Sequence, residues 1–327
     1  MIQTLKIKMM KKQIKQIFLT VFVFALNCIG ASIIIAQNAD DGKILAREKY
    51  QFAPFEKVQG LEKIYSKKEY EEAVNDSAFE MERLIYSSDG LSVVGYLYKP
   101  KNTENKKYPA IIFNRGGYIR GNIGYELAPF FRRLALEGFV VIAPLYRASD
   151  GADGKDEVGG GDVKDLMNLL PLAKSLDFIE TKNLFLYGES RGGMMTFQAV
   201  RNNFPANAAA TFGAFTDFEA LITASPKLYQ PLIKAIWTDF EARKDEIIKT
   251  RSALQWADKI NVPLLLMHGG SDQSVDPLQT LNFAQTLQKL GKSYELMIYN
   301  GDNHILSKNQ KDRDAKAIAW FKKHLEQ

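Results

Sequence analysis

The chain has 327 residues, of which 46% are hydrophobic and 25% charged, an ordinary globular composition that fits one large α/β domain or two small ones. Its formal charge of +5 comes from five lysines within the first 36 residues, a segment without acidic residues. Because the remainder is neutral, the basic balance gives no argument for nucleic-acid binding.

Residues 1–36 have the order of an export signal. Lysines up to Lys15 precede a largely apolar stretch from Ile17 to Ala36, and cleavage after Ala36 would make the protein periplasmic or extracellular. Two alternatives stay open: the stretch is long enough to remain as a membrane anchor, and Cys28, the only cysteine, could be lipidated after cleavage before it. Membrane association is expected only in those two cases.

The next segment leads into a β-hairpin. Residues 37–80 are polar and include a helix-forming run from Lys67 to Val74, so we interpret them as an N-terminal helical extension without chemistry. The runs Met81 to Tyr86 and Leu91 to Tyr98 are strand-like and are joined by the turn-forming residues 87–90. We expect this hairpin at the antiparallel edge of a sheet.

After Pro100, apolar runs alternate with helical stretches. The runs are Ala110–Phe113, Phe139–Ala143, Leu184–Tyr187, Ala208–Phe212, Pro263–Met267 and Tyr294–Tyr299. Most are continuously apolar, as expected of parallel strands covered on both faces. Residues 81–327 are therefore predicted to form a doubly wound, mostly parallel α/β domain.

One connection is too long for a plain crossover. About 50 residues separate the strand ending at Phe212 from the strand starting at Pro263. Their apolar residues recur with helical spacing, which predicts a helical cap inserted at about residues 216–258. We interpret the cap aromatics as the core of the cap and not as substrate contacts.

The run Asn183–Gly193 carries the clearest chemical signal. An apolar strand leads directly into Gly188-Glu189-Ser190-Arg191-Gly192, and a helix from Met194 to Asn203 follows. This is the pattern of a nucleophile elbow, in which glycines allow the tight turn that exposes a serine hydroxyl. Ser190 is the predicted nucleophile.

A serine hydroxyl needs a general base nearby, and the chain has three histidines. His304 follows the strand Tyr294–Tyr299 on a polar loop, at the sheet edge where sites form, and is the predicted base. His268 ends the preceding strand, where we assign it a structural role. His324 lies on the C-terminal amphipathic helix and is interpreted as a surface residue.

The base needs a carboxylate to orient it. Asp272 follows a strand and lies between Ser190 and His304, giving the chain order Ser, Asp, His of the α/β-hydrolase fold. Asp276 opens the next helix and is interpreted as its cap. Asp302 is the alternative orienting carboxylate.

Two groups of residues complete the predicted site. The oxyanion hole is expected to combine the N–H of Arg191 with a donor from the loop Arg115-Gly116-Gly117-Tyr118, which follows a strand. Glu189 and Arg191 flank the nucleophile with opposite charges. Either they form a local ion pair that supports the turn, or Arg191 or Arg115 binds a substrate carboxylate.

From Met81 to the C-terminus the chain resembles the catalytic domain of the prolyl oligopeptidase family of serine hydrolases. The resemblance is carried by Gly188–Gly193, Val262–Val275, Lys289–His304, Tyr146–Gly151 and Gly161–Asp165. It implies an α/β-hydrolase fold and the same triad roles for Ser190, Asp272 and His304.

The chain departs from the family pattern in two ways. Members with a tyrosine hydroxyl in the oxyanion hole carry it just before the paired glycines, where this chain has Arg115. The family's peptidases also owe their substrate selection to a β-propeller of several hundred residues, for which 327 residues leave no room.

Three functions follow as hypotheses. The first is an exported serine peptidase acting on short peptides through an acyl-enzyme. The second is a carboxylesterase on small or carbohydrate-linked acyl esters, and the third is a non-catalytic binding protein on the same fold. The triad mechanism needs no metal or organic cofactor, and the expected partner is a small peptide or ester substrate. The pattern leaves the oligomeric state open.

Overall fold

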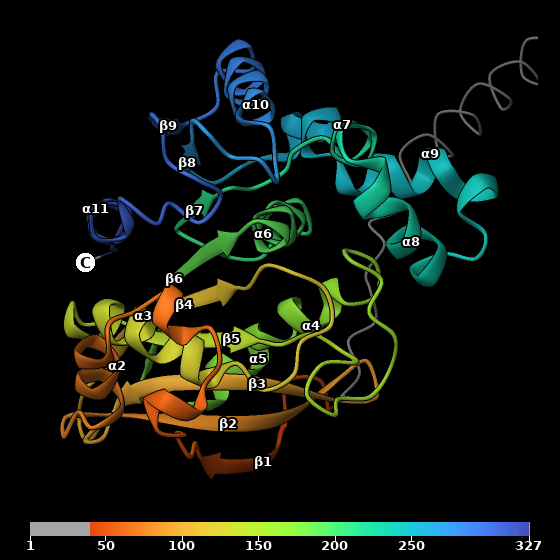
Figure 1. Ribbon diagram of the computed structural model, residues 1–327. Helices are drawn as coiled ribbons and strands as arrows, with labels where there is room; N and C mark the ends of the chain where they lie inside the picture. Colours follow the sequence, from red (N-terminus) through yellow and green to blue (C-terminus); the bar gives the residue numbers. More distant parts are fainter. Residues whose placement is uncertain (1–39, 327) are drawn as a thin grey trace, which may run out of the picture. The chain divides into compact units, whose positions relative to one another are not determined.

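The computed structural model describes residues 40–326 (Figure 1). The predicted export signal, the anchor alternative and Cys28 lie outside these residues.

Within residues 40–326, nine strands form one mixed sheet in the order β1-β2-β3-β5-β4-β6-β7-β8-β9. The strands are β1 (Ile44–Lys49), β2 (Phe79–Ser88), β3 (Leu91–Pro100), β4 (Tyr108–Asn114), β5 (Val140–Pro144), β6 (Ile179–Glu189), β7 (Ala208–Phe212), β8 (Leu264–Gly269) and β9 (Tyr294–Tyr299). The pairs from β5 through β4 to β9 are parallel, and those from β1 to β5 through β2 and β3 are antiparallel. The predicted doubly wound α/β architecture is confirmed.

The hairpin of β2 and β3 forms where the sequence predicts it. Ser88 pairs with Leu91, which leaves a two-residue loop. Asp89 and Gly90 both have positive φ, 57° and 78°, as a type I′ turn requires, and this turn matches the right-handed twist of the flanking strands.

The prediction for the sheet edge is wrong. Strand β1 lies in the segment interpreted as a helical extension, and it pairs antiparallel with β2, so β1 forms the edge and the hairpin lies one strand further in. Only Ile44 of β1 is even partly buried. A short edge strand rich in charge avoids pairing with other chains, but it lacks the alternating apolar pattern that identifies a strand in a sequence.

The rest of the extension is helical. It contains the short 3-10 turns η1 (Phe55–Lys57) and η2 (Leu61–Lys63) and the helix α2 (Lys67–Val74). Ser66 and Glu69 form a reciprocal capping box at the start of α2, which satisfies two otherwise free backbone donors.

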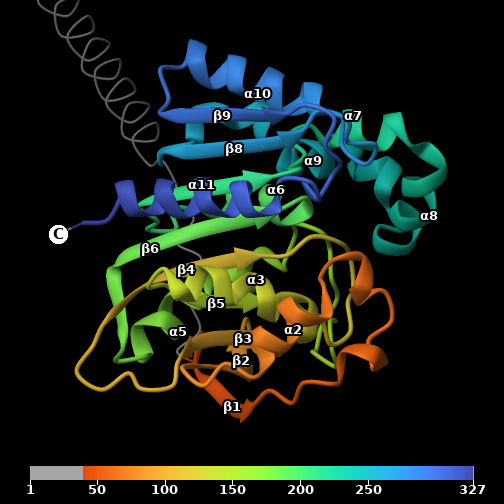
Figure 2. The same cartoon turned by 60° about the vertical axis from the view of Figure 1, so that its left-hand side comes forward.

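Helices cover both faces of the sheet (Figures 1 and 2). Helices α3 (Gly124–Leu136) and α11 (Gln310–Lys323) pack on one face, through a core that includes Phe131, Leu134 and Phe321. The opposite face carries α4 (Val163–Met167), α5 (Leu169–Ser175), α6 (Arg191–Arg201) and α10 (Pro277–Lys289).

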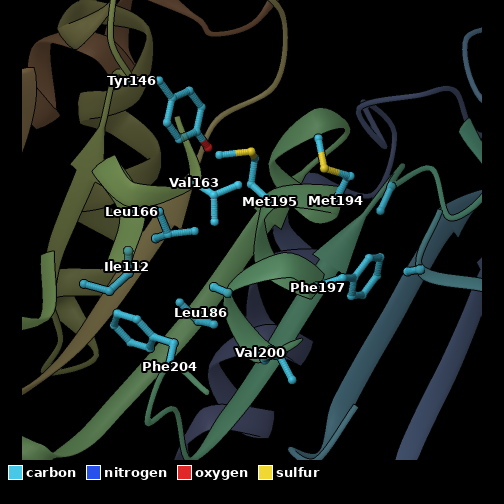
Figure 3. Close-up of a cluster of buried hydrophobic side chains, with 14 of the residues drawn as sticks. Ile112, Tyr146, Val163, Leu166, Leu186, Met194, Met195, Phe197, Val200 and Phe204 are labelled. Atoms are coloured by element: carbon cyan, nitrogen blue, oxygen red, sulfur yellow. The ribbon is translucent and has the colours of Figure 1, made fainter. Parts of the chain in front are cut away.

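The core between the sheet and α6 fixes the helix that follows the elbow. Figure 3 shows Met194, Met195 and Phe197 of α6 in one cluster of buried hydrophobic side chains, which also includes Leu186 of β6 and Ile112 of β4. All five side chains are almost fully buried. Because the close packing of such side chains resists displacement, the first turn of α6 is held firmly at the end of β6.

Between β7 and β8 the chain forms the helices α7 (Phe218–Ala224), α8 (Pro226–Ile236) and α9 (Phe240–Arg251) and the turn η3 (Ala253–Lys259). Figure 2 shows α7 and α8 beyond the carboxyl ends of the neighbouring strands. Arg251 ties this insertion to the main domain by donating to the carbonyl oxygens of Glu157 and Val158. No helix in residues 40–326 has the length and apolar character of a membrane span.

Candidate active site

Ser190 lies in a sharp turn between β6 and α6. Its backbone has φ 52° and ψ −118°, a conformation that costs energy for any residue with a Cβ and that is typical of nucleophile elbows. The Ser190 N–H donates to the carbonyl oxygen of Phe212 at 2.9 Å, so the turn is anchored to the end of β7.

The turn is possible because Gly192 lacks a side chain. A Cβ at Gly192 would lie 1.8 Å from the carbonyl oxygen of Asn114, and one at Gly188 would lie 2.4 Å from the carbonyl oxygen of Gly192. Both obstructing atoms belong to the backbone, which cannot swing away. The two glycines therefore let α6 approach the end of β4, and with it the loop that follows β4.

Asp272 and His304 come together although 32 residues separate them. The His304 Nδ1 lies 2.7 Å from Oδ2 of Asp272. The ring packs against Gly213, where a Cβ would meet Nδ1 at 3.0 Å. Because Gly213 follows Phe212, whose carbonyl accepts the Ser190 N–H, this contact places the imidazole beside the elbow.

Both oxygens of the Asp272 carboxylate have hydrogen-bond partners within the protein. Its Oδ1 accepts from the N–H groups of Ser274 and Val275, at 2.7 and 3.0 Å, and its Oδ2 also contacts His268 Nε2 at 2.9 Å. Burial alone would raise the pKa of Asp272, but the hydrogen bonds from His268 and His304 outweigh it and hold the pKa well below its ordinary value. The group is therefore a fixed negative charge.

Two other candidate residues have supporting positions. His268 is buried, with Nδ1 2.7 Å from the Thr280 hydroxyl, and it braces the loop that carries Asp272. Asp302 accepts from the N–H groups of Asn303, Lys308 and Asn309 and so shapes the loop of His304. The structure gives His304 Nδ1 to Asp272, and the alternative orienting role of Asp302 is not observed.

The loop after β4 lies against the nucleophile. A Cβ at Gly116 would sit 3.2 Å from Cβ of Ser190. In residues 40–326 the N–H groups of Gly116 and Gly117 have no protein acceptor, and Arg191, as the first residue of α6, has no intrahelical acceptor. These donors are the ones available to stabilise negative charge on an oxygen bound at Ser190.

The Arg115 side chain holds this loop and faces away from the oxyanion position. Its guanidinium donates to the carbonyl oxygens of Gly116, at 3.0 Å, and Tyr118, at 2.7 Å, and also binds Leu145 O and the Ser149 hydroxyl. Burial and the neighbouring charge of Arg191 lower the pKa of Arg115 to about 10. The Tyr118 hydroxyl donates to Asp156 O at 3.4 Å, so neither side chain replaces the family's tyrosine.

The predicted ion pair between Arg191 and Glu189 is wrong. Its guanidinium is buried between Asp156 and Asp162, at 2.7 and 2.8 Å, and donates to Gly117 O at 3.0 Å. Although burial would lower its pKa, the two carboxylates raise it above the ordinary value. With these partners Arg191 does not pair with Glu189, and its charge is balanced by two carboxylates of the protein itself.

Glu189 points away from Arg191. Glu189 ends β6 and lines a cavity with Phe212 and Ile305 that Arg191 does not line. Arg191 opens α6, and its guanidinium is held on Asp156 and Asp162. Burial raises the pKa of its carboxyl, which the positive charge of Arg313 only partly opposes. No hydrogen bond or ion pair holds this carboxylate within residues 40–326.

A first cavity of about 140 Å³ opens at Ser190. Its wall is mostly apolar: α7 and α8 contribute six of the fifteen lining residues, and Ser274 and Val275 come from the Asp272 loop. Phe218 and Trp237 line the cavity and also belong to the buried core. The interpretation of the cap aromatics as core alone is therefore incomplete.

The sequence did not reveal the residues that hold Arg191 in place. Asp156 and Asp162 lie 35 and 29 residues from their partner Arg191, and nothing in their local sequence predicts that contact. Ile64 and Tyr65 bring the N-terminal extension to the cavity lined by Glu189. The extension thus contributes part of the wall of a cavity next to the elbow.

A strained serine beside a histidine paired with a carboxylate, on this sheet, defines a serine hydrolase. The model of the prolyl oligopeptidase family matches residues 130–327. The chain belongs to the prolyl oligopeptidase family and is a serine peptidase-like hydrolase with an α/β-hydrolase fold. The alternative of a non-catalytic binding protein is set aside.

Among curated proteins, the uncharacterized peptidase YtmA of Bacillus subtilis is 26% identical over 241 residues, which are 73% of this chain and 92% of YtmA. The chain matches a smaller share of its larger relatives. It spans 39% of the uncharacterized peptidase YuxL of the same organism and 25% of human dipeptidyl peptidase 8.

Solved structures agree on the fold. A puromycin-hydrolyzing peptidase of Mycobacterium tuberculosis is similar with a TM-score of 0.63 and 23% identity, over 72% of this chain and 38% of that one. An acetyl xylan esterase from Paenibacillus sp. R4 has the same TM-score at 13% identity, over 86% of this chain and 88% of the esterase. Peptidases and esterases thus share this architecture.

Proposed function

We propose that this protein is an exported serine peptidase that cleaves short peptides, with Ser190 as nucleophile, His304 as general base and Asp272 as the carboxylate that orients the base. The observation that carries the proposal is the 2.7 Å contact between His304 Nδ1 and Asp272, on an imidazole that packs beside the strained turn of Ser190.

The proposed reaction follows the serine hydrolase sequence. Ser190 Oγ attacks the carbonyl carbon while His304 Nε2 takes its proton, and the ionised Asp272 stabilises the imidazolium that forms. His304 then gives the proton to the leaving nitrogen, and the acyl group stays on Ser190. Water, activated by the same imidazole, releases the acid.

The oxyanion of the tetrahedral intermediate is assigned to backbone donors. The N–H of Arg191 supplies one, and the N–H of Gly116 or Gly117 supplies the second. Arg115 and Arg191 serve this hole through their side chains, because both hold carbonyl oxygens of the same short loop. Donors fixed in advance stabilise the charge without reorganising during the reaction.

The first cavity is the proposed acyl-side pocket. Ser190 and Arg191 open into it, and apolar side chains from α7 and α8 form much of its wall. Burying an apolar side chain against such a wall contributes about 1.5–3 kcal/mol. We therefore assign it an apolar residue on the acyl side of the bond that is cleaved.

Two matched substrates test the substrate class. Both carry the same apolar aminoacyl group, which is linked as an arylamide in the first and as an aryl ester in the second. We expect turnover of both, because the match to the prolyl oligopeptidase family favours a peptidase. Replacing the apolar residue by glutamate should lower kcat/KM about 10-fold or more, since its charge loses solvation in the pocket. Ester turnover without arylamide turnover at high enzyme concentration would instead support the esterase, the alternative raised by the acetyl xylan esterase.

Export is tested on cells that produce the full chain. The order of lysines and apolar residues in positions 1–36 supports a mature protein that starts at Gln37 outside the cytoplasm. Cell fractionation measures the location of the protein, and the intact mass of the purified protein measures where it starts. Phe24→Asp places a charge in the apolar stretch and should keep the chain in the cytoplasm. A full-length mass in the membrane fraction indicates an anchor, and a lipidated chain starting at Cys28 indicates lipidation.

A further inference from the structure

A second cavity of about 240 Å³ lies beside the same elbow. It is lined by Glu189, which precedes Ser190, and by Ile305, which follows His304. Tyr65 of the N-terminal extension and Phe130 of α3 form other parts of its wall. Neither Ser190 nor any residue of the cap helices lines it, so it is distinct from the acyl-side pocket.

The position of this cavity assigns it to the leaving side of the substrate. His304 must reach the leaving nitrogen to protonate it, so the leaving group departs on the histidine's side of Ser190. Phe212, which also lines the cavity, directly precedes the Gly213 against which the imidazole packs. A group bound here lies next to the base and on the other side of the elbow from the acyl pocket.

The charges in the cavity are paired except for one. Arg120 binds Glu126 through both carboxylate oxygens, at 2.7 and 2.9 Å. Arg313 is held by Asp314 at 2.7 and 2.8 Å and stacks on the ring of Phe212. Within residues 40–326 the Glu189 carboxylate has no such partner, although it lies among protein atoms that raise its pKa.

Two neutral acceptors accompany this carboxylate. Tyr65 and Gln310 also line the cavity, and within the part of the chain that the structure describes neither side chain has a hydrogen-bond partner. An ammonium group donates three hydrogen bonds and accepts none.

We propose that the second cavity binds a basic side chain on the leaving part of a peptide, with Glu189 as its counter-ion. The inference rests on the proposed function, because it requires an acyl-enzyme at Ser190, and it deepens that function by naming a preference for lysine or arginine after the bond that is cleaved. The free carboxylate gains most from a cation because its charge is poorly solvated in the cavity.

The test measures how the acyl-enzyme partitions between water and an added amine. One aryl ester forms the acyl-enzyme throughout, and lysine amide or norleucine amide is added as nucleophile. The amine nitrogen attacks the acyl carbon, the bond to Ser190 Oγ breaks, and His304 transfers the amine proton to Oγ. The ratio of amide product to acid product reports binding on the leaving side, independent of the ester's own leaving group.

Wild type should transfer the acyl group to lysine amide about 10-fold more readily than to norleucine amide. In Glu189→Gln the two amines should be captured equally, and comparing them within one variant cancels any change in overall rate. Glu126→Gln removes a carboxylate from the same cavity that already has a partner, so it should keep the preference for lysine amide.

Equal capture of both amines by wild type, with ester hydrolysis intact, would overturn the inference and leave the proposed function standing. The same holds if Glu126→Gln loses the preference as fully as Glu189→Gln, since the net charge of the cavity would then be responsible. If no acyl-enzyme forms from any ester, the proposed function fails and the inference fails with it.

Discussion

Replacing Ser190 by alanine is expected to lower kcat by about 10⁵- to 10⁶-fold, with little change in KM. The substitution removes the only atom that forms the acyl-enzyme and leaves the substrate pockets intact. Alanine meets the same positive φ as serine, so the melting temperature should not fall. Steady-state kinetics on the arylamide and the ester measure the loss.

A fluorophosphonate probe reports the same nucleophile without a substrate. Wild type should be labelled and Ser190→Ala should not. Ser274→Ala is the matched control, because Ser274 lines the same cavity but lies in the Asp272 loop and should leave labelling unchanged. Labelling that persists in Ser190→Ala would show that another residue is the nucleophile.

Replacing Asp272 by asparagine is expected to lower kcat by about 10³- to 10⁴-fold. The amide can donate to His304 Nδ1, which moves the imidazole proton to Nε2, the nitrogen that must accept the proton of Ser190. The imidazolium also loses its counter-charge. Asp276→Asn is the control, since Asp276 caps α10 through the Leu278 N–H and asparagine caps equally well.

The same variant tests the fixed charge on Asp272. Its folded pKa lies below the unfolded value of about 3.9, so its stabilising contribution is present above that value and is lost as the pH falls toward the folded pKa. The difference in unfolding free energy between wild type and Asp272→Asn should therefore shrink as the pH falls below about 4, toward the folded pKa of Asp272. A difference that keeps its full size or grows as the pH falls from about 4 to about 2 would contradict the assigned ionisation state.

Much of the fold could be predicted because its signals are local. The parallel strands are continuous apolar runs, and the hairpin carries the Asp89-Gly90 turn that its geometry demands. Strand β1 escaped prediction because nearly all of it is exposed. Its pairing depends on β2, more than 30 residues away, and not on its own sequence.

In the candidate site, too, the sequence predicts the residues with local signals and does not predict the contacts between distant ones. An apolar strand before a serine between glycines, together with one histidine and one aspartate at the ends of later strands, identifies Ser190, Asp272 and His304 as candidates. The residues around them could not be assigned from the sequence. Arg191 is adjacent to Ser190 in the chain, yet its side chain is held by Asp156 and Asp162 from another loop.

By itself, therefore, the sequence determined the sheet, the elbow and the types of residue available for acyl transfer. These depend on hydrophobic runs and turn chemistry within a few residues. Only the tertiary structure decided that Arg191 braces the oxyanion loop, while Glu189 has no ion-pair partner within residues 40–326. Ion pairing depends on which groups packing brings within a few ångströms, and for these residues the partners lie tens of positions apart.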